Sequence, residues 1–231
     1  MKKFLLLAMI LCSNQVFAST NDSTDLNSLI ENDRNFFDQE VKESLPFTDE
    51  EQDRLFTLVK EQLKMKDYNF STQQLILIVD RGIHKQDIAI ALVGPDEASW
   101  NLIGETHVST GKPGRKEHFK TPTGIFFNDG SILGYRAEGT YNENHIRGLG
   151  VKGMRVWDFG WQTTEDWRTH TDTMKIRMEM HATDPSVLAP RIGRPDSEGC
   201  IRIPADMNVF LEHNGVIDKD LELKSETQRS F

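Results

Sequence analysis

The stretch HATDPSVLAPRIGRPDSEGCIRI, residues 181–203, indicates more about the fold and chemistry of this chain than any other. It begins where residues 175–181 alternate between apolar and polar, which predicts a β-strand that ends on His181. Prolines and glycines then predict a loop that can fold back and bring Cys200 near the histidine. Gly199 precedes the cysteine, so the backbone there can approach a substrate closely and turn its amide inward.

Cys200 has four possible roles: a small buried side chain, half of a disulfide, a metal ligand or a nucleophile. The sequence has only two cysteines, and the other, Cys12, lies in a segment that we expect to be removed. We expect the protein to be exported to an oxidising compartment, as argued below. An unpaired thiol there is either deeply buried or has a chemical role, and the residues alone leave both interpretations open. A nucleophilic thiol needs a base and amide donors for the oxyanion, and His181 is the candidate base. There is no His-x-x-x-His or Cys-x-x-Cys pair, so we expect no metal and no other cofactor.

The first eighteen residues predict a secretory signal peptide that is cut after Ala18. Two lysines precede an apolar run, residues 4–12, and Val16 and Ala18 suit the positions before the cut. The run is far shorter than the roughly 20 residues needed to cross a bilayer, and no later segment is longer. Leu11 stands before Cys12, where a lipoprotein signal would have a small residue, so we expect no lipidation. The mature chain is therefore expected to be exported and not to be an integral membrane protein.

The charge of the chain excludes two classes of partner. The full sequence has a formal net charge of −9, and removal of residues 1–18 leaves 25 basic and 36 acidic side chains, a charge of −11. Such an acidic protein has no electrostatic basis for binding nucleic acid or an anionic membrane surface.

Residues 19–70 predict a small helical segment ahead of the main domain. Apolar positions between Leu26 and Val41 fit one helix loosely. Thr48 followed by Glu51 three residues later is a capping box, and it predicts the start of a second, clearer helix. Its apolar face is formed by Leu55, Phe56, Val59 and Leu63.

Residues 71–231 predict one mainly β domain with few helices. The apolar, β-branched runs at residues 75–80, 88–93 and 102–109 are typical of strands. The segment RVWDFGWQTTEDW, residues 155–167, concentrates aromatic side chains, and Trp157 and Trp161 are candidates for a wall that contacts substrate. The competing interpretation is that these rings lie in the core.

Two blocks of the sequence together resemble the L,D-transpeptidases, the family with the YkuD-type (ErfK/YbiS-type) catalytic domain. Residues 181–203 are similar to its signature, with a histidine at the end of a strand, an Ile-Gly-x-Pro approach and a Ser-x-Gly-Cys-x-Arg core. The second block, STGKPGRKEHFKTPTGIF, residues 109–126, resembles a stretch that the family carries upstream. The resemblance covers about residues 74–212 and implies a β-sandwich or mixed-sheet catalytic domain.

The resemblance implies a role for each residue of the signature. Cys200 would be the nucleophile and His181 the general base, with the Ala182 carbonyl steering the imidazole. The amides of Gly199 and Cys200 would form the oxyanion hole. Ser197 would orient the loop, and Arg202 would brace it and suit a substrate carboxylate.

Glu198 is a departure from the family pattern. Many relatives have a histidine at this position, and a glutamate adds negative charge beside the thiol. We count Glu198 among the residues that contact substrate.

The implied reaction is acyl transfer on peptidoglycan stem peptides in the periplasm, at the cell wall. The thiol would attack the bond after the third residue of a tetrapeptide stem, release D-alanine and form a thioester. An amine of another stem, a protein lysine or a D-amino acid would then accept the acyl group, and a carbapenem would acylate the same cysteine. The alternatives are an L,D-carboxypeptidase or a hydrolase that detaches proteins from the wall, and a catalytically silent wall-binding protein.

Overall fold

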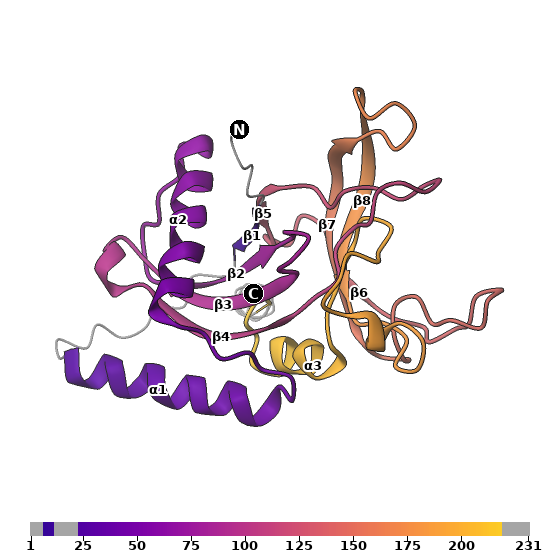
Figure 1. Ribbon diagram of the computed structural model, residues 1–231. Helices are drawn as coiled ribbons and strands as arrows, with labels where there is room; N and C mark the ends of the chain where they lie inside the picture. Colours follow the sequence, from indigo (N-terminus) through magenta and orange to yellow (C-terminus); the bar gives the residue numbers. More distant parts are fainter. Residues whose placement is uncertain (1–6, 12–22, 219–231) are drawn as a thin grey trace, which may run out of the picture.

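The computed structural model describes residues 7–11 and 23–218. Within these residues the chain forms three α-helices and two β-sheets, so the architecture is mixed α/β (Figure 1). The first sheet has the strand order β4-β3-β2-β1-β5 and the second the order β6-β7-β8-β9. The elements are β1 (Leu7–Leu11), α1 (Ser23–Glu40), α2 (Asp49–Lys66), β2 (Gln74–Asp80), β3 (Asp87–Val93), β4 (Asn101–His107), β5 (Gly124–Phe127), β6 (Tyr135–Arg136), β7 (Arg155–Glu165), β8 (Thr173–His181), β9 (Ile201–Arg202) and α3 (Ala205–His213).

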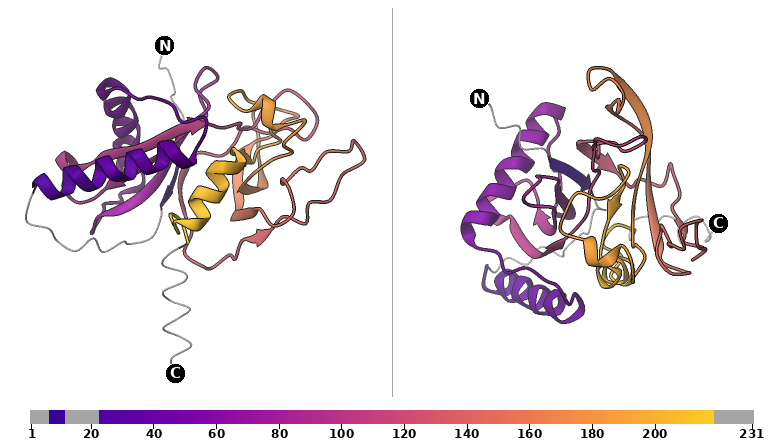
Figure 2. Two further views of the ribbon diagram at one scale, coloured as in Figure 1. Left: turned by 90° about the horizontal axis from the view of Figure 1, so that it is seen from below. Right: turned by 45° about the vertical axis from the view of Figure 1, so that its right-hand side comes forward.

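The first sheet is buried on both faces, which explains why its strands are almost continuously apolar. Along β2, Leu77 and Val79 point into the core between the two sheets, and Ile76 and Ile78 point to the opposite face. That opposite face is covered by α2, as Figures 1 and 2 show. Because successive side chains of a strand point to opposite faces, β2 contributes to two separate hydrophobic clusters.

Helix α2 begins where the capping box predicts it. Thr48 is the N-cap, and its Oγ1 accepts a hydrogen bond from the amide of Glu51 at 3.2 Å. The predicted apolar face is buried against the sheet, where Phe56 packs edge-on against Trp100 at 5.5 Å between ring centroids. This part of the sequence prediction is confirmed.

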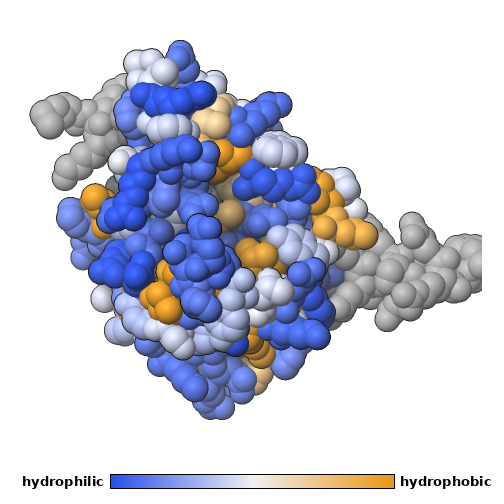
Figure 3. Space-filling model, turned by 90° about the vertical axis from the view of Figure 1, so that its right-hand side faces the viewer, coloured by the Kyte–Doolittle hydropathy of each residue, from blue (hydrophilic) through white to orange (hydrophobic). Residues whose placement is uncertain are grey.

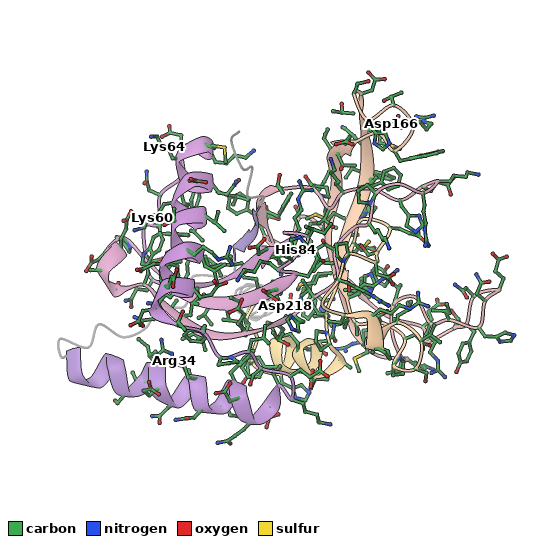
Figure 4. The ribbon with its side chains drawn as sticks, in the orientation of Figure 1. Arg34, Lys60, Lys64, His84, Asp166 and Asp218 are labelled. Carbon is green, nitrogen blue, oxygen red and sulfur yellow. The ribbon has the colours of Figure 1, made fainter. Side chains whose placement is uncertain are left out.

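Helix α1 lies beside β4, at the edge of the first sheet, and also contacts α3 (Figure 2). Phe37 is fully buried and lies directly over Gly104 of β4, where an added Cβ would come within 2.1 Å of its ring. Arg34, labelled in Figure 4, donates from Nε to the Leu102 carbonyl at 2.9 Å. The helical segment therefore packs on the sheets and contributes to their core. Among the described helices, none combines the length and apolar character that a membrane crossing needs.

Strand β1 lies within the predicted signal peptide. In the uncleaved chain, Leu7–Leu11 pairs antiparallel with β2 and parallel with β5. Cleavage after Ala18 would therefore remove a strand from inside the first sheet. The signal peptide stays a prediction, because the cleavage site and Cys12 lie outside the described residues.

The second sheet positions the candidate site. Its strands β7 and β8 form a long antiparallel hairpin that extends beyond the first sheet (Figure 1). Met178 and Met180 of β8 point into the core. The intervening residues of β8, Arg177, Glu179 and His181, therefore point to the other face of this sheet. The short parallel pairing of β8 with β9 places Ile201 opposite Met180, so Cys200 arrives beside the same face.

Candidate functional site

A pocket of about 510 Å³ opens on this face, and both His181 and Cys200 line it. Its other walls come from residues 142–149, from Arg115 and His118, and from the loop that leads to Cys200. Figure 3 shows the molecule from the side of the second sheet, where the surface is mostly hydrophilic with isolated hydrophobic residues. The structure thus brings together the two residues that the signature singles out.

The imidazole of His181 is held in one orientation by the neighbouring backbone. The residue is 4% exposed, and its Nδ1 lies 2.5 Å from the carbonyl oxygen of Ala182. A carbonyl can only accept, so Nδ1 carries the proton and Nε2 is left as an acceptor. Burial lowers the pKa of His181 to about 4, because the charged form is poorly solvated. At neutral pH the ring is therefore an uncharged base.

The thiol of Cys200 is also uncharged at neutral pH. Burial raises its pKa to about 11, and the backbone amide of Glu179 offsets part of this effect. The carboxylates of Glu179 and, more weakly, Glu198 raise the pKa further. Within the described part of the chain, the hydrogen bond of Sγ is with the Arg177 carbonyl, at 3.9 Å, and none joins it to His181. The thiol and the imidazole are therefore both neutral at neutral pH.

The two blocks of the resemblance lie side by side and hold the cysteine loop. Gly111 forms a parallel bridge with Ser197, and the amide of Lys112 donates to the Ser197 carbonyl at 2.9 Å. The buried Thr121 Oγ1 accepts from the amide of Gly111 and donates to the carbonyl of Gly199, each at 2.8 Å. Thr121 is therefore the side chain that joins the two blocks next to the thiol.

Gly199 is conformationally required, but its amide is engaged differently from the prediction. It has φ of +135°, a region that favours glycine, and its N–H donates to Ser197 Oγ at 3.1 Å. Ser197 Oγ in turn donates to the Cys200 carbonyl at 2.6 Å, so Ser197 orients the loop through its backbone. Of the two amides predicted for the oxyanion hole, only that of Cys200 has no other hydrogen bond among the described residues.

Arg202 and Glu198 both line the pocket. Nη1 of Arg202 donates to the carbonyl of Asp196 at 3.1 Å and lies 3.3 Å from its carboxylate, so the guanidinium is already paired within the loop. Glu198 is exposed at the pocket rim. Of these two residues, Glu198 is therefore the one whose side chain is free to face a substrate.

The two tryptophans have different environments, and one prediction is wrong. Trp157 is 1% exposed, lies in the core between the sheets and donates from Nε1 to Asp218 at 2.9 Å, so it cannot contact substrate. Trp161 is 62% exposed and pairs with Arg177 across β7 and β8, but it is not part of the pocket lining. A β-bulge between Asp158 and Trp161 separates the two rings onto opposite faces.

Glu179 and Tyr135 were not singled out from the sequence. Glu179 lines the pocket, and its carboxylate accepts from the Tyr135 hydroxyl at 2.9 Å. Burial raises the pKa of Glu179, although the Tyr135 hydrogen bond offsets part of this effect. Its position two residues before His181 on a strand was the available signal, because such residues share one face.

The side chain of Asp184, three residues after His181, is bound by backbone amides and stabilises the loop. Its carboxylate accepts from the amides of Arg147, Ser186 and Val187 at 2.8–3.1 Å. In residues 7–11 and 23–218, no three His, Cys, Asp or Glu side chains converge as metal ligands do.

A comparison with models of known protein families finds no match, and a comparison with characterised proteins finds no significant relative.

Proposed function

We propose that this protein is a cysteine acyltransferase that acts on peptidoglycan stem peptides, with the activity of an L,D-transpeptidase. The observation that supports this most is the shared pocket of Cys200 and His181, with Nδ1 of His181 bonded to the Ala182 carbonyl. That hydrogen bond leaves Nε2 available to take the proton of the thiol. The resemblance of residues 181–203 and 109–126 supplies the substrate class.

In the first step, Sγ of Cys200 attacks the carbonyl carbon of the third stem residue while His181 Nε2 takes the thiol proton. In this proposal the Cys200 amide, which has no other hydrogen bond among the described residues, donates to the developing oxyanion. The carbon–nitrogen bond then breaks, His181 returns the proton to the amine of D-alanine, and a thioester remains. A neutral Cys200 thiol and a neutral His181 imidazole suit this order of steps, because no charge has to be buried before the substrate binds.

In the second step, an amine acceptor attacks the thioester and His181 takes its proton. The carbon–sulfur bond breaks, and the thiolate recovers the proton from His181. The acceptor is an amine of a second stem in this proposal, which gives a 3→3 cross-link. Water as acceptor would make the same thiol a carboxypeptidase.

Intact-mass spectrometry tests the proposal directly. The wild-type protein should gain the mass of one carbapenem and should release D-alanine from a disaccharide-tetrapeptide. Cys200→Ala should do neither, and Cys200→Ser should be slowed strongly because a hydroxyl is the weaker nucleophile. An adduct or D-alanine release that persists in Cys200→Ala would overturn the assignment. Analysis of the muropeptide products separates cross-linking from trimming.

A further inference from the structure

A second cavity, of about 630 Å³, is lined by Gly111, which pairs with Ser197 of the thiol pocket. Three segments far apart in the sequence line it, and the volume falls within the range of about 300–1,000 Å³ that is typical of ligand sites. One of these segments is the loop between β2 and β3, which His84 marks in Figure 4. The lining residues are Arg81, Gly82, Ile83, Thr110, Gly111, Lys112, Pro113, Lys120, Arg194 and Pro195.

The lining of this second cavity is strongly cationic. It contains four basic side chains and, among the described residues, no acidic one. Lys120 is paired with Glu165 at 2.5 Å, and the same carboxylate acts on Arg81, whose guanidinium donates to the Thr121 carbonyl. Within the described part of the chain, Lys112 and Arg194 form no ion pair. Burial lowers the pKa of Arg81 to about 10, which still leaves it charged at neutral pH. In a chain with a net charge of −9, two cations without an ion-pair partner at one cavity, Lys112 and Arg194, favour an anionic ligand.

A buried glutamine joins two of the segments that line this cavity. Gln86 is fully buried, and its Nε2 donates to the carbonyls of Arg81 at 2.9 Å and Gly82 at 3.3 Å. Its Oε1 accepts from the amide of Thr110 at 2.7 Å and from its hydroxyl at 3.0 Å. The β2–β3 loop and the Thr110 segment are thereby locked together, so the cavity is preformed.

The cavity also presents apolar surface next to its charges. Ile83 is 71% exposed, and Pro113 and Pro195 complete this part of the lining. A small inorganic anion would leave this surface uncovered. A peptide with several carboxylates would use both, because its backbone and aliphatic atoms can pack on Ile83.

We propose that this second cavity binds an acidic peptide, with carboxylates paired to Lys112 and Arg194. A guanidinium can bind a carboxylate through two parallel hydrogen bonds, and the Lys112 ammonium adds a second point of attachment. The proposal goes beyond acyl transfer at Cys200 and holds whether or not the thiol is a nucleophile. A peptide bound here would be separated from the thiol pocket only by the bridge between Gly111 and Ser197.

Titration calorimetry with tetra-L-glutamate tests the site, using the full chain with Cys200→Ala so that no acylation occurs. We expect saturable binding at low salt, and Lys112→Glu or Arg194→Glu should each weaken it about fivefold, with little left in the double variant. Lys64→Glu makes the same charge change on the exposed surface of α2 (Figure 4) and should leave the affinity unchanged. All four substituted positions are to be checked for a wild-type circular dichroism spectrum and melting temperature.

Two controls identify the ligand class and the cavity. Tetra-L-glutamine should not bind, and inorganic phosphate should bind more weakly than the peptide. Equal binding of phosphate would overturn the peptide assignment, and equal losses in Lys112→Glu and Lys64→Glu would overturn the site. Loss of binding in Arg115→Glu alone would place the peptide in the thiol pocket and also overturn the proposal. Carbapenem acylation of the double variant with Cys200 intact, expected at the wild-type rate, tests the proposed chemistry separately.

Discussion

The bridge between Gly111 and Ser197 contributes one residue to each of two cavities, and these cavities differ in how charge is arranged. The thiol pocket has acids and bases in balance: Arg115, Arg191 and Arg202 face Glu179, Asp196 and Glu198. The second cavity has basic side chains and no acidic ones among its described lining. The thiol pocket keeps Cys200 and His181 uncharged, and the second cavity concentrates positive charge. This difference fits the two proposals, in which the thiol pocket carries out acyl transfer and the second cavity binds an anionic peptide.

Substitution of Gly111 should damage both cavities and give the largest effect. A Cβ at this position would lie 1.9 Å from the backbone oxygen of Phe119, which cannot move aside easily. We expect Gly111→Ala to lose most acylation and most tetraglutamate binding, and to lower the free energy of unfolding by about 1–3 kcal/mol. Carbapenem mass shifts, calorimetry and urea denaturation measure the three quantities.

Gly148→Ala is the matched control for stability, since an added Cβ there meets no atom within 4 Å. If Gly111→Ala were as stable and active as wild type, the close packing of Gly111 against Phe119 would not be needed to hold the two cavities together.

Substitution of His181 should affect the thiol pocket and leave the second cavity unchanged. We expect His181→Gln to slow acylation of Cys200 by about 10²–10⁴-fold, because a general base contributes on this scale. Tetraglutamate binding should be unchanged, because His181 does not line the second cavity. Stopped-flow or timed mass measurements give the rate, and a near-normal rate would mean that another group takes the proton.

Removal of the Thr121 hydroxyl should have a smaller effect on the rate. Thr121→Val keeps the shape but leaves the Gly111 amide and the Gly199 carbonyl without their partner. Each unpaired buried group costs about 1–3 kcal/mol, so the melting temperature should fall clearly and acylation should slow about tenfold. Thr123→Val, two residues along the same turn, is the control. Equal stability of the two variants would show that Thr121 does not hold the cysteine loop.

The rate of acylation should change least when the pH is varied across the neutral range. Acylation should rise as the pH passes about 4, where His181 loses its proton, and should then stay level. Absorbance at 240 nm should detect thiolate only near pH 11, because the pKa of Cys200 is raised. A thiolate titrating below pH 8 would indicate a charged thiolate–imidazolium pair.

The same depressed pKa affects stability. Between pH 6.5 and about 4, the unfolded chain binds a proton at His181 that the folded chain does not. Stability should therefore fall as the pH is lowered through this window. Thermal melts of wild type and His181→Gln should show a difference in this slope.

Local patterns predicted the elements that depend on local interactions. The Thr48 cap and the apolar face of α2 follow from hydrogen bonds and side-chain spacing within one turn or two. Strand β7 was not predicted, because the bulge at Asp158–Trp161 interrupts the alternation from which a strand is inferred. For the same reason Trp157 and Trp161 could not be assigned to opposite faces.

The sequence alone was enough to identify Cys200 as a cysteine without an expected partner, His181 as the end of a strand and Gly199 as a glycine that the backbone needs. These depend on residue identity and short spacing. Only the tertiary structure decided that Glu179 faces the thiol, that Ser197 takes the Gly199 amide and that Lys112 and Arg194 share a cavity with Arg81. The physical reason is that the pairing of β8 with β9 and the bridge between Gly111 and Ser197 bring distant segments together. Burial and charge at a site depend on all the segments that surround it.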